Sequence, residues 1–473
     1  MKKLFVRNQR LLCAYMKSAF SFVLLLLCSM AWAQNINSPS VFKPASLDTE
    51  LRADQWCSTP GTLDDTCINN AIAALPANGG TVILSTGTYV LANTVTVTAP
   101  KRVFIRGQNS SMGLQHPQGS GTHGSTYITW NGTTGGTMFK FTATLSAVID
   151  FSGLSDVDID CGGGGVGQVA GVGVLAATIW NSTFRNLHIS YCSIAGFELT
   201  TINGTGGGID GPGSYLNANK NDNLDTLYFE NSGGSGIGLW ITGDTTDAGG
   251  PNTNYSTFHN ITAFYSNAPG IKISTGDDNT FYQITMFYQT PGSATAGILL
   301  QASQPHAANC CNIFYGVDPS NKGFVTQTGV YGTQIFGWLN GNGGPDPTGP
   351  GITTVFSSAD GRIIGPSGTL FWPTAPTIQS GFTSGASVIA NNGTAAFRIT
   401  VGTGYNSGGY VTMPAAAHGW ICSCQDYNIT SSTFVCRAVP DTTTAIQLNN
   451  YNISGALTAW NPNDVLDVAC TGY

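Results

Sequence analysis

An imperfect repeat between residues 150 and 340 constrains the fold of this chain more than any other feature. Its units share a glycine followed by alternating apolar residues, as in "AGFELTTI", "GIGLWITG", "PGIKISTG", "AGILLQAS" and "KGFVTQTG". Their glycines, Gly196, Gly238, Gly270, Gly297 and Gly323, lie 42, 32, 27 and 26 residues apart. A unit of two or three short strands cannot bury its apolar side alone, so successive units must stack. The repeat therefore predicts an all-β fold, a right-handed parallel β-helix with about 4.8 Å between coils.

One helix is expected before these coils. Asp64 and Asp65 can cap its start, and apolar residues recur at helical spacing until Pro76 ends it. Three strand-like runs follow, "GGTVILSTGTYVL", "NTVTVTA" and "RVFIRGQ". The helix, over residues 65–75, is expected to cap the open N-terminal end of the β-helix.

The stretch "DDTCINNAIAALPANGGTVILSTGTYVL" followed by "RVFIRGQ" resembles the start of the pectate-lyase-like β-helix superfamily. This superfamily includes pectate lyases, polygalacturonases, rhamnogalacturonases and phage tailspikes, and the resemblance covers residues 45–340. It implies the fold and a polysaccharide as ligand or substrate, but it does not imply one reaction, because these families share coils and not a catalytic motif. The trimers of many tailspikes make a homotrimer an option, although the sequence offers no coiled-coil segment.

Three regions are expected along the chain. Residues 1–33 read as a signal peptide, with the apolar core "FSFVLLLLCSM" before a small-x-small cleavage site at Ala31–Ala33. Residues 34–377 would form the β-helix with a closing coil and a Pro/Gly-rich linker. Residues 378–473 would form a β-sandwich-like module, because "AAFRITVG", "GGYVTMPA", "AIQLNNYNI" and "NDVLDVACTGY" alternate like sandwich strands. Its "GWICSC" and "DVACTGY" resemble a C-terminal module of phage tail and exported bacterial proteins.

The net charge limits the classes of binding partner, and the number of cysteines indicates the cellular compartment. Five of the 18 Lys and Arg residues lie in the signal, so the mature chain carries 13 bases against 25 acids, a net charge of −12. Such a surface repels nucleic acid and anionic membranes. We expect secretion, with disulfides among the ten cysteines that remain, of which Cys57 and Cys67 bracket a short loop. Cys422, Cys424, Cys436 and Cys470 form a separate C-terminal set, and no spacing resembles a zinc site.

Two outward columns of side chains are the candidate site. Val157 and Ile159 should point inward, so the residues between and after them should face solvent. One column is then Asp158, His188, Tyr228, Thr262 and Thr285, and its neighbour is Asp160, Ser190, Glu230, Phe264 and Phe287. Acids beside exposed aromatic rings suit a polysaccharide, since rings stack on sugars while carboxylates act as acid and base.

The predicted function is that of a glycoside hydrolase acting on a neutral or weakly acidic polysaccharide. Asp160 and Glu230 would be the acid/base pair, two coils or roughly 10 Å apart, which is near the range for inverting hydrolysis. Asp158 and His188 would assist, and Tyr228 and Phe264 would stack on sugar. A polar outer face ending in a turn would explain the same residues without catalysis.

Further candidates rank lower. On the other strand set, Trp240 and Lys272 offer a second face for binding sugar. Asp277 and Asp278, in "GDDN", read first as a turn between strands, because Asn tolerates left-handed backbone and short carboxylates bond their own backbone. Asp244 is a third acid of this rank.

Two other classes of function compete with the hydrolase. One is a non-catalytic adhesin or tailspike-like protein, favoured by the missing catalytic motif. The other is a polysaccharide lyase that uses calcium, the one cofactor the sequence leaves open. The lyase fits less well, because the candidate face shows no Lys or Arg.

Overall fold

The structure is a computed structural model that describes residues 49–472, except for the segments given next. These are 112–124, 145–146, 163–167, 202–218, 231–235, 244–252, 289–291, 302–308, 340–346, 348, 350–351, 358–362, 366–367, 372–375, 417 and 428–433. The expected signal peptide and the candidate Asp244 lie outside the described residues. In the part that is described, no helix is long and apolar enough to cross a membrane.

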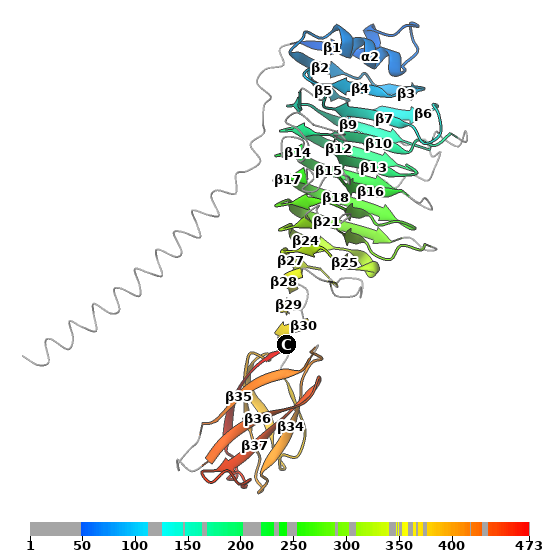
Figure 1. Ribbon diagram of the computed structural model, residues 1–473. Helices are drawn as coiled ribbons and strands as arrows, with labels where there is room; N and C mark the ends of the chain where they lie inside the picture. Colours follow the sequence, from blue (N-terminus) through cyan, green and yellow to red (C-terminus); the bar gives the residue numbers. More distant parts are fainter. Residues whose placement is uncertain are drawn as a thin grey trace, which may run out of the picture. The chain divides into compact units, whose positions relative to one another are not determined.

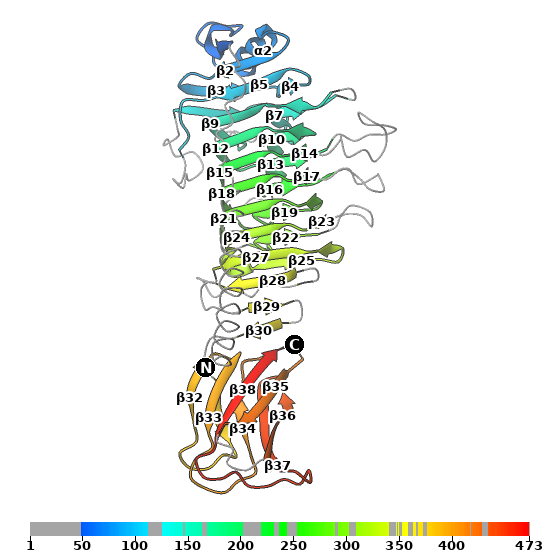
Figure 2. The same ribbon diagram turned by 90° about the vertical axis from the view of Figure 1, so that its left-hand side faces the viewer.

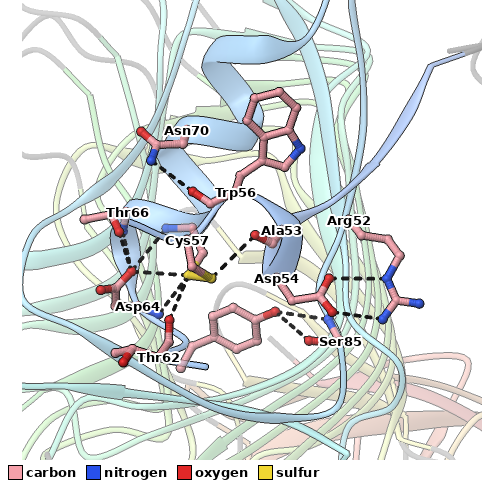
Figure 3. Close-up of a disulfide and its surroundings, with 12 residues drawn as sticks. Arg52, Ala53, Asp54, Trp56, Cys57, Thr62, Asp64, Thr66, Asn70 and Ser85 are labelled. Carbon is pink, nitrogen blue, oxygen red and sulfur yellow. Dashed lines mark hydrogen bonds and ion pairs between the residues drawn. A yellow bond between two sulfur atoms is a disulfide. The ribbon is translucent and has the colours of Figure 1, made fainter. Parts of the chain in front are cut away.

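The expected helix, α2 (Asp65–Ala74), and a short 3-10 turn, η1 (Ala53–Gln55), lie between the first strand, β1 (Glu50–Arg52), and β2 (Gly79–Ile83). Asp64 is the N-cap, and its carboxylate accepts hydrogen bonds from the backbone N–H groups of Thr66 and Cys67 at 3.0 and 3.1 Å. A disulfide joins Cys57 to Cys67 and ties the segment before the helix to its first turn. Figure 3 shows this disulfide between η1 and the N-cap. The expected helix over 65–75 is thus confirmed, and the two cysteines that bracket the loop prove to be paired.

At the other end of the helix, Lys101 satisfies backbone groups that helix geometry leaves open. Its ammonium donates to the carbonyls of Ile72 and Leu75 at 2.9 and 3.0 Å. Ile68 and Ile72 belong to the same core as the coils below, so the helix covers the end of the stack.

Three parallel sheets form the β-helix, and each coil contributes a strand to every sheet over most of its length. The first sheet follows the order β1 (Glu50–Arg52), β2 (Gly79–Ile83), β5 (Arg102–Arg106), β9 (Gly153–Asp160), β12 (Thr183–Ser190), β15 (Asn223–Glu230), β18 (Thr257–Tyr265), β21 (Thr280–Tyr288), β24 (Ile313–Asp318), β27 (Thr333–Trp338) and β28 (Ile352–Ser357). β3 (Gly87–Leu91) pairs with β6 (Thr126–Trp130), which in turn pairs with β9, and β28 continues antiparallel into β29 (Ile363–Gly365) and β30 (Gly368–Phe371).

The second sheet contains β4 (Val95–Thr98), β7 (Thr137–Thr142), β10 (Val172–Ala177), β13 (Ala195–Thr200), β16 (Ile237–Ile241), β19 (Ile271–Ile273), β22 (Ile298–Leu300) and β25 (Phe324–Thr326). The third contains β8 (Ile149–Asp150), β11 (Ile179–Trp180), β14 (Asn219–Lys220), β17 (Thr253–Asn254), β20 (Gly276–Asp277), β23 (Asn309–Cys310) and β26 (Val330–Tyr331). A second 3-10 turn, η4 (Ser320–Lys322), precedes β25. Figures 1 and 2 show the coils stacked one on another, as a right-handed parallel β-helix requires.

The predicted inward register is confirmed in both long sheets. In the first sheet, Val157, Leu187, Leu227, Ile261 and Ile284 are successive ladder partners. In the second sheet, Phe197, Leu239, Ile271, Ile298 and Phe324 are partners in the same way. All of these residues belong to one buried core, so each coil covers the apolar side of the next.

Antiparallel strands form the C-terminal part, as predicted. One four-stranded sheet contains β31 (Thr377–Ser380), β34 (Gly408–Thr412), β37 (Ala445–Asn452) and β36 (Phe434–Thr442); the other contains β32 (Ser387–Asn392), β33 (Ala396–Thr400), β38 (Val465–Gly472) and β35 (Trp420–Asp426). They share a core of their own, which includes Trp420 and Trp460. Disulfides Cys422–Cys470 and Cys424–Cys436 confirm the predicted C-terminal cysteine set.

A ladder of buried polar side chains runs along the inside of one corner of the β-helix. In each step the backbone N–H of one coil donates to the side chain at the equivalent position of the next coil. Ser152, Ser182, Asp222, Ser256, Asn279 and Asn312 form the ladder, with donor–acceptor distances from 2.9 to 3.3 Å. Asn and Ser are neutral, but Asp222 is an acid that is 1% exposed and whose Oδ2 makes no hydrogen bond among the described residues. Burial, aided by the charge of Asp150, raises the pKa of Asp222 well above its usual value.

Asp222→Asn is expected to remove a pH dependence of stability. Because the folded-state pKa of Asp222 is raised, the stability that the neutral acid contributes is complete below about pH 4 and is lost as pH rises toward the folded pKa. Each pH unit between the unfolded and the folded pKa removes about 1.4 kcal/mol from the free energy of unfolding. The variant should therefore gain stability over the parent as pH increases. Urea unfolding from pH 4 to pH 9 measures this, with Glu50→Gln, an exposed acid, as control. If the free energy of unfolding changed with pH in the same way for Asp222→Asn and for the parent, the prediction that Asp222 is a neutral acid in the folded protein would be wrong.

Candidate active site on the first sheet

Both predicted outward columns exist in the structure. Asp158, His188, Tyr228, Thr262 and Thr285 are successive ladder partners, and so are Asp160, Ser190, Glu230, Phe264 and Phe287. The first three members of each column lie at the ends of β9, β12 and β15. Acidic side chains, a histidine and a tyrosine are thus brought together from three coils.

A bend in each strand separates these columns from the rest of the first sheet. Asp156, Asn186, Thr226, Asn260 and Gln283 all have left-handed backbone, with φ between 51° and 61°, and each is skipped in the ladder register. Asp and Asn adopt this conformation more readily than other residues with a side chain. The Asn186 amide also donates to the Asp156 carboxylate at 2.8 Å. The last four residues of β9, β12 and β15 therefore form a face of their own.

The expectation that these side chains face solvent is wrong. Asp158, Asp160, His188 and Glu230 are only 3 to 4% exposed, and Tyr228 is 5% exposed. Segments from much earlier in the chain contribute to the burial, because β6 pairs with the end of β9 and Ser111 contacts two members of the cluster. Alternation along a strand predicts which side of a sheet a residue occupies, but it does not predict whether another segment covers that side.

Asp160 accepts hydrogen bonds from two described donors. The Tyr127 hydroxyl of β6 donates to its Oδ2 at 2.6 Å, and the Gly162 backbone N–H donates to its Oδ1 at 2.8 Å. The two bonds place one donor on each carboxylate oxygen. Burial and the neighbouring Asp160 raise the pKa of Tyr127, so its phenol stays protonated and remains a donor. Asp160 is thus a buried carboxyl group held in one orientation.

His188 and Glu230 form a second unit. His188 Nε2 lies 3.5 Å from Glu230 Oε2, and the Tyr191 hydroxyl donates to Glu230 Oε1 at 3.3 Å. On the other side of the ring, His188 Nδ1 lies 2.9 Å from the Ser111 hydroxyl oxygen. The predicted Asp158–His188 dyad is linked through Ser111, whose backbone N–H donates to Asp158 Oδ1 at 2.7 Å.

Three residues of this cluster were absent from the sequence-based prediction. Tyr191 follows the last residue of β12 directly, so a longer reading of that strand could have included it. Tyr127 lies 33 residues before Asp160; it alternates with the buried Thr126 and Ile128 in β6 and is the ladder partner of Asp158, so the strand pattern could have found it. Ser111 lies 77 residues before His188, and no local pattern marks it.

Aromatic rings continue from the cluster along the coils. Tyr228 packs edge-on against His188 at 4.8 Å between ring centroids and tilted against Phe264 at 5.4 Å. Phe264 stacks on Phe287 at 4.6 Å, and Phe287 is 40% exposed. Burial, with the charge of Glu230, raises the pKa of Tyr228. Of the two predicted sugar-stacking residues, Tyr228 is covered and Phe264 is half-buried, so Phe287 is the accessible end of the column.

Trp240 and Lys272 lie on the second sheet and do not join the cluster. They are ladder partners on β16 and β19, with Glu198 of β13 on the other side of Trp240. The Lys272 ammonium lies 5.2 Å from the Trp240 ring, and the indole N–H donates to Ser274 at 3.1 Å. Burial lowers the pKa of Lys272 and raises that of Glu198. This second outward face combines an acid, a ring and a base.

The pair Asp277 and Asp278 belongs to a turn of the third sheet, as the first interpretation of "GDDN" held. Asp277 ends β20, and Asp278 has the left-handed backbone of the turn, with φ of 52°. Burial and Asp278 raise the pKa of Asp277. Among the described residues, Asp277 also approaches Cys310 and Cys311 at a spacing that would suit a metal ion, but these two cysteines form a disulfide.

No family model and no curated protein matches this chain. Among solved structures, it is similar to ORF18 of Geobacillus virus E2, with 14% identity, coverage of 87% of this chain and 78% of that one, and a TM-score of 0.35. It is similar to an alginate lyase from Paenibacillus sp. str. FPU-7 (11% identity, 63% and 98% coverage, TM-score 0.37). It is also similar to the phiAB6 tailspike, in complex with oligosaccharides of Acinetobacter baumannii surface polysaccharide (14% identity, 89% and 86% coverage, TM-score 0.33). The strand pairing of the chain itself confirms the β-helix that the sequence resemblance implied.

Tyr127→Phe is expected to lower the free energy of unfolding by about 1.5–3 kcal/mol, because it removes a hydrogen bond to a buried carboxylate. Urea unfolding at neutral pH measures this. Tyr282→Phe is the matched control, since that phenol lies on a more exposed column of stacked rings on the same sheet. Equal effects of the two substitutions would show that Tyr127 does not stabilise the anion.

Proposed function

We propose that this protein hydrolyses a polysaccharide, with Asp160 and Glu230 as its acid/base pair. The observation that carries the proposal is their placement: both carboxylates belong to one column of the first sheet, both are buried, and only Glu230 lies against a histidine. Two carboxyl groups in different environments are the requirement of glycoside hydrolysis by acid and base.

Different neighbours assign different roles to the two carboxylates. Tyr127 and Gly162 hold Asp160 in one orientation through hydrogen bonds, which suits a base that activates water. Glu230 lies against His188, and this pair can share a proton that is given to the glycosidic oxygen. The two carboxylates are separated by two ladder steps, about 10 Å. This leaves room for water and favours inversion at the anomeric carbon over a covalent intermediate.

The aromatic column provides a place for the sugar chain beyond the cluster. Phe264 and Phe287 continue the line of Asp160 and Glu230 along the coils, so a chain bound across the site would run over their exposed edges. Aromatic side chains contribute apolar area without a charge, which suits a neutral or weakly acidic sugar.

A calcium-dependent lyase is the second candidate, because three carboxylates lie within two ladder steps of one another: Asp158 and Asp160 on β9 and Glu230 on β15. Carboxylate oxygens are the ligands that calcium prefers. The described residues of the cluster include no Lys or Arg that could neutralise a uronate, so hydrolysis remains the better proposal.

Glu230→Gln is expected to abolish the formation of reducing ends on the polysaccharide that the parent protein cleaves, a loss of at least about 10²-fold. The assay screens plant and microbial polysaccharides and records reducing ends together with the ultraviolet absorbance of new double bonds, with calcium or with a chelator. Hydrolysis gives reducing ends without absorbance.

The matched control is Glu198→Gln, the same substitution at a half-buried glutamate of the second sheet. It should retain activity. Loss of activity in Glu198→Gln but not in Glu230→Gln would move the site to the Trp240 face. Absorbance that requires calcium would replace the hydrolase with the lyase.

A further inference from the structure

A serine, a histidine and a glutamate are aligned within the candidate site. The Ser111 hydroxyl oxygen lies 2.9 Å from His188 Nδ1, and His188 Nε2 lies 3.5 Å from Glu230 Oε2. Glycoside hydrolysis by two carboxylates does not need this serine. The geometry is that of an activated nucleophile, in which a base contacts the hydroxyl and a third group orients the base.

We propose that Ser111 is a nucleophile that removes small acyl esters, such as acetyl groups, from sugar hydroxyls. The activation of Ser111 follows from the contacts of the three side chains alone. The assignment of a sugar ester as substrate, in contrast, rests on the proposed polysaccharide function.

The neighbours of His188 favour one arrangement of its ring proton. With the carboxylate of Glu230 3.5 Å from Nε2, a proton on Nε2 leaves Nδ1 to accept from the Ser111 hydroxyl. The ring nitrogens exchange roles relative to the usual serine–histidine–aspartate arrangement, in which the serine contacts Nε2. The chemistry needs a hydroxyl, a base and a carboxylate in line, and this order is present here.

The reaction balances with water as the only co-reactant. Ser111 Oγ attacks the ester carbonyl carbon, the hydroxyl proton moves to His188 Nδ1, and the sugar oxygen leaves with that proton. Water then attacks the acyl-serine, Nδ1 takes a proton from the water, and Ser111 Oγ regains it as the carboxylic acid departs.

The proposed nucleophile, Ser111, is less buried than His188 and Glu230, the two residues aligned with it. Glu230 and His188 are almost fully covered, whereas Ser111 is half-buried. Its backbone N–H donates to Asp158, which holds the residue against the imidazole. Ser111 is therefore the least covered of the three residues, and the enclosure of His188 and Glu230 favours a small acyl group.

The two proposed activities use the His188–Glu230 pair in different protonation states. With a proton to give, the pair is the acid for a glycosidic oxygen. With Nδ1 unprotonated, it is the base for Ser111. One site can therefore act on the chain of a polysaccharide and on its ester groups.

The test is covalent labelling of the purified full chain with a fluorophosphonate, which reacts with activated serines, followed by mass spectrometry of the peptides. We expect one adduct on Ser111, together with hydrolysis of 4-nitrophenyl acetate. Ser111→Ala should lose the adduct and lower kcat for this ester by roughly 10³-fold or more. The labelling of the parent protein requires no variant to fold.

Ser110→Ala is the matched control, because the neighbouring hydroxyl is buried and makes no hydrogen bond among the described residues. The Ser110→Ala variant should still form the adduct on Ser111 and should hydrolyse 4-nitrophenyl acetate as fast as the parent protein. Absence of an adduct on Ser111 in the folded parent, or an esterase rate unchanged by Ser111→Ala, would overturn the proposal. The labelling uses no polysaccharide, so a failure of the proposed chain cleavage, seen as absence of new reducing ends, is recorded separately.

Discussion

Parallel pairing between successive coils is the interaction on which the rest of this structure depends. A single coil exposes its apolar side, so Leu187 or Ile189 is covered only when the next coil places Leu227 or Phe229 beside it. The pairing also fixes every outward residue, because side chains alternate along a strand and a slip by one position would exchange the two sides. The column from Asp160 to Glu230 exists because a column from Ile159 to Phe229 is buried beneath it.

Hydrogen bonds hold the buried polar side chains of the inner ladder and of the candidate site. The inner ladder from Ser152 to Asn312 uses side chains to satisfy backbone N–H groups at a corner. The candidate site follows the same rule on the outer side, where Tyr127 and Gly162 hold the buried Asp160. An unpaired carboxylate at such a depth would cost several kcal/mol. The hydrogen bonds thus allow the site to be both charged and enclosed.

The enclosed cluster joins the proposed acid/base pair to the proposed nucleophile. Asp160 bonds to Tyr127 and Gly162, whereas His188 lies between Glu230 on one side and Ser111 on the other. The aromatic column from Tyr228 to Phe287 leads from this cluster toward solvent. The structure thus places an enclosed cluster of polar side chains next to a column of rings that ends at the exposed Phe287.

The sequence alone determined the coil repeat, the inward register, the two outward columns and the helix at the N-terminal end, because all of these follow from periodicity and local capping. It also placed Asp158, Asp160, His188 and Glu230 on one face. Only the tertiary structure decided that this face is covered and that Ser111 and Tyr127 belong to it. These contacts join residues 33 to 77 positions apart, and no local pattern records which segment folds over a sheet once the coils have stacked.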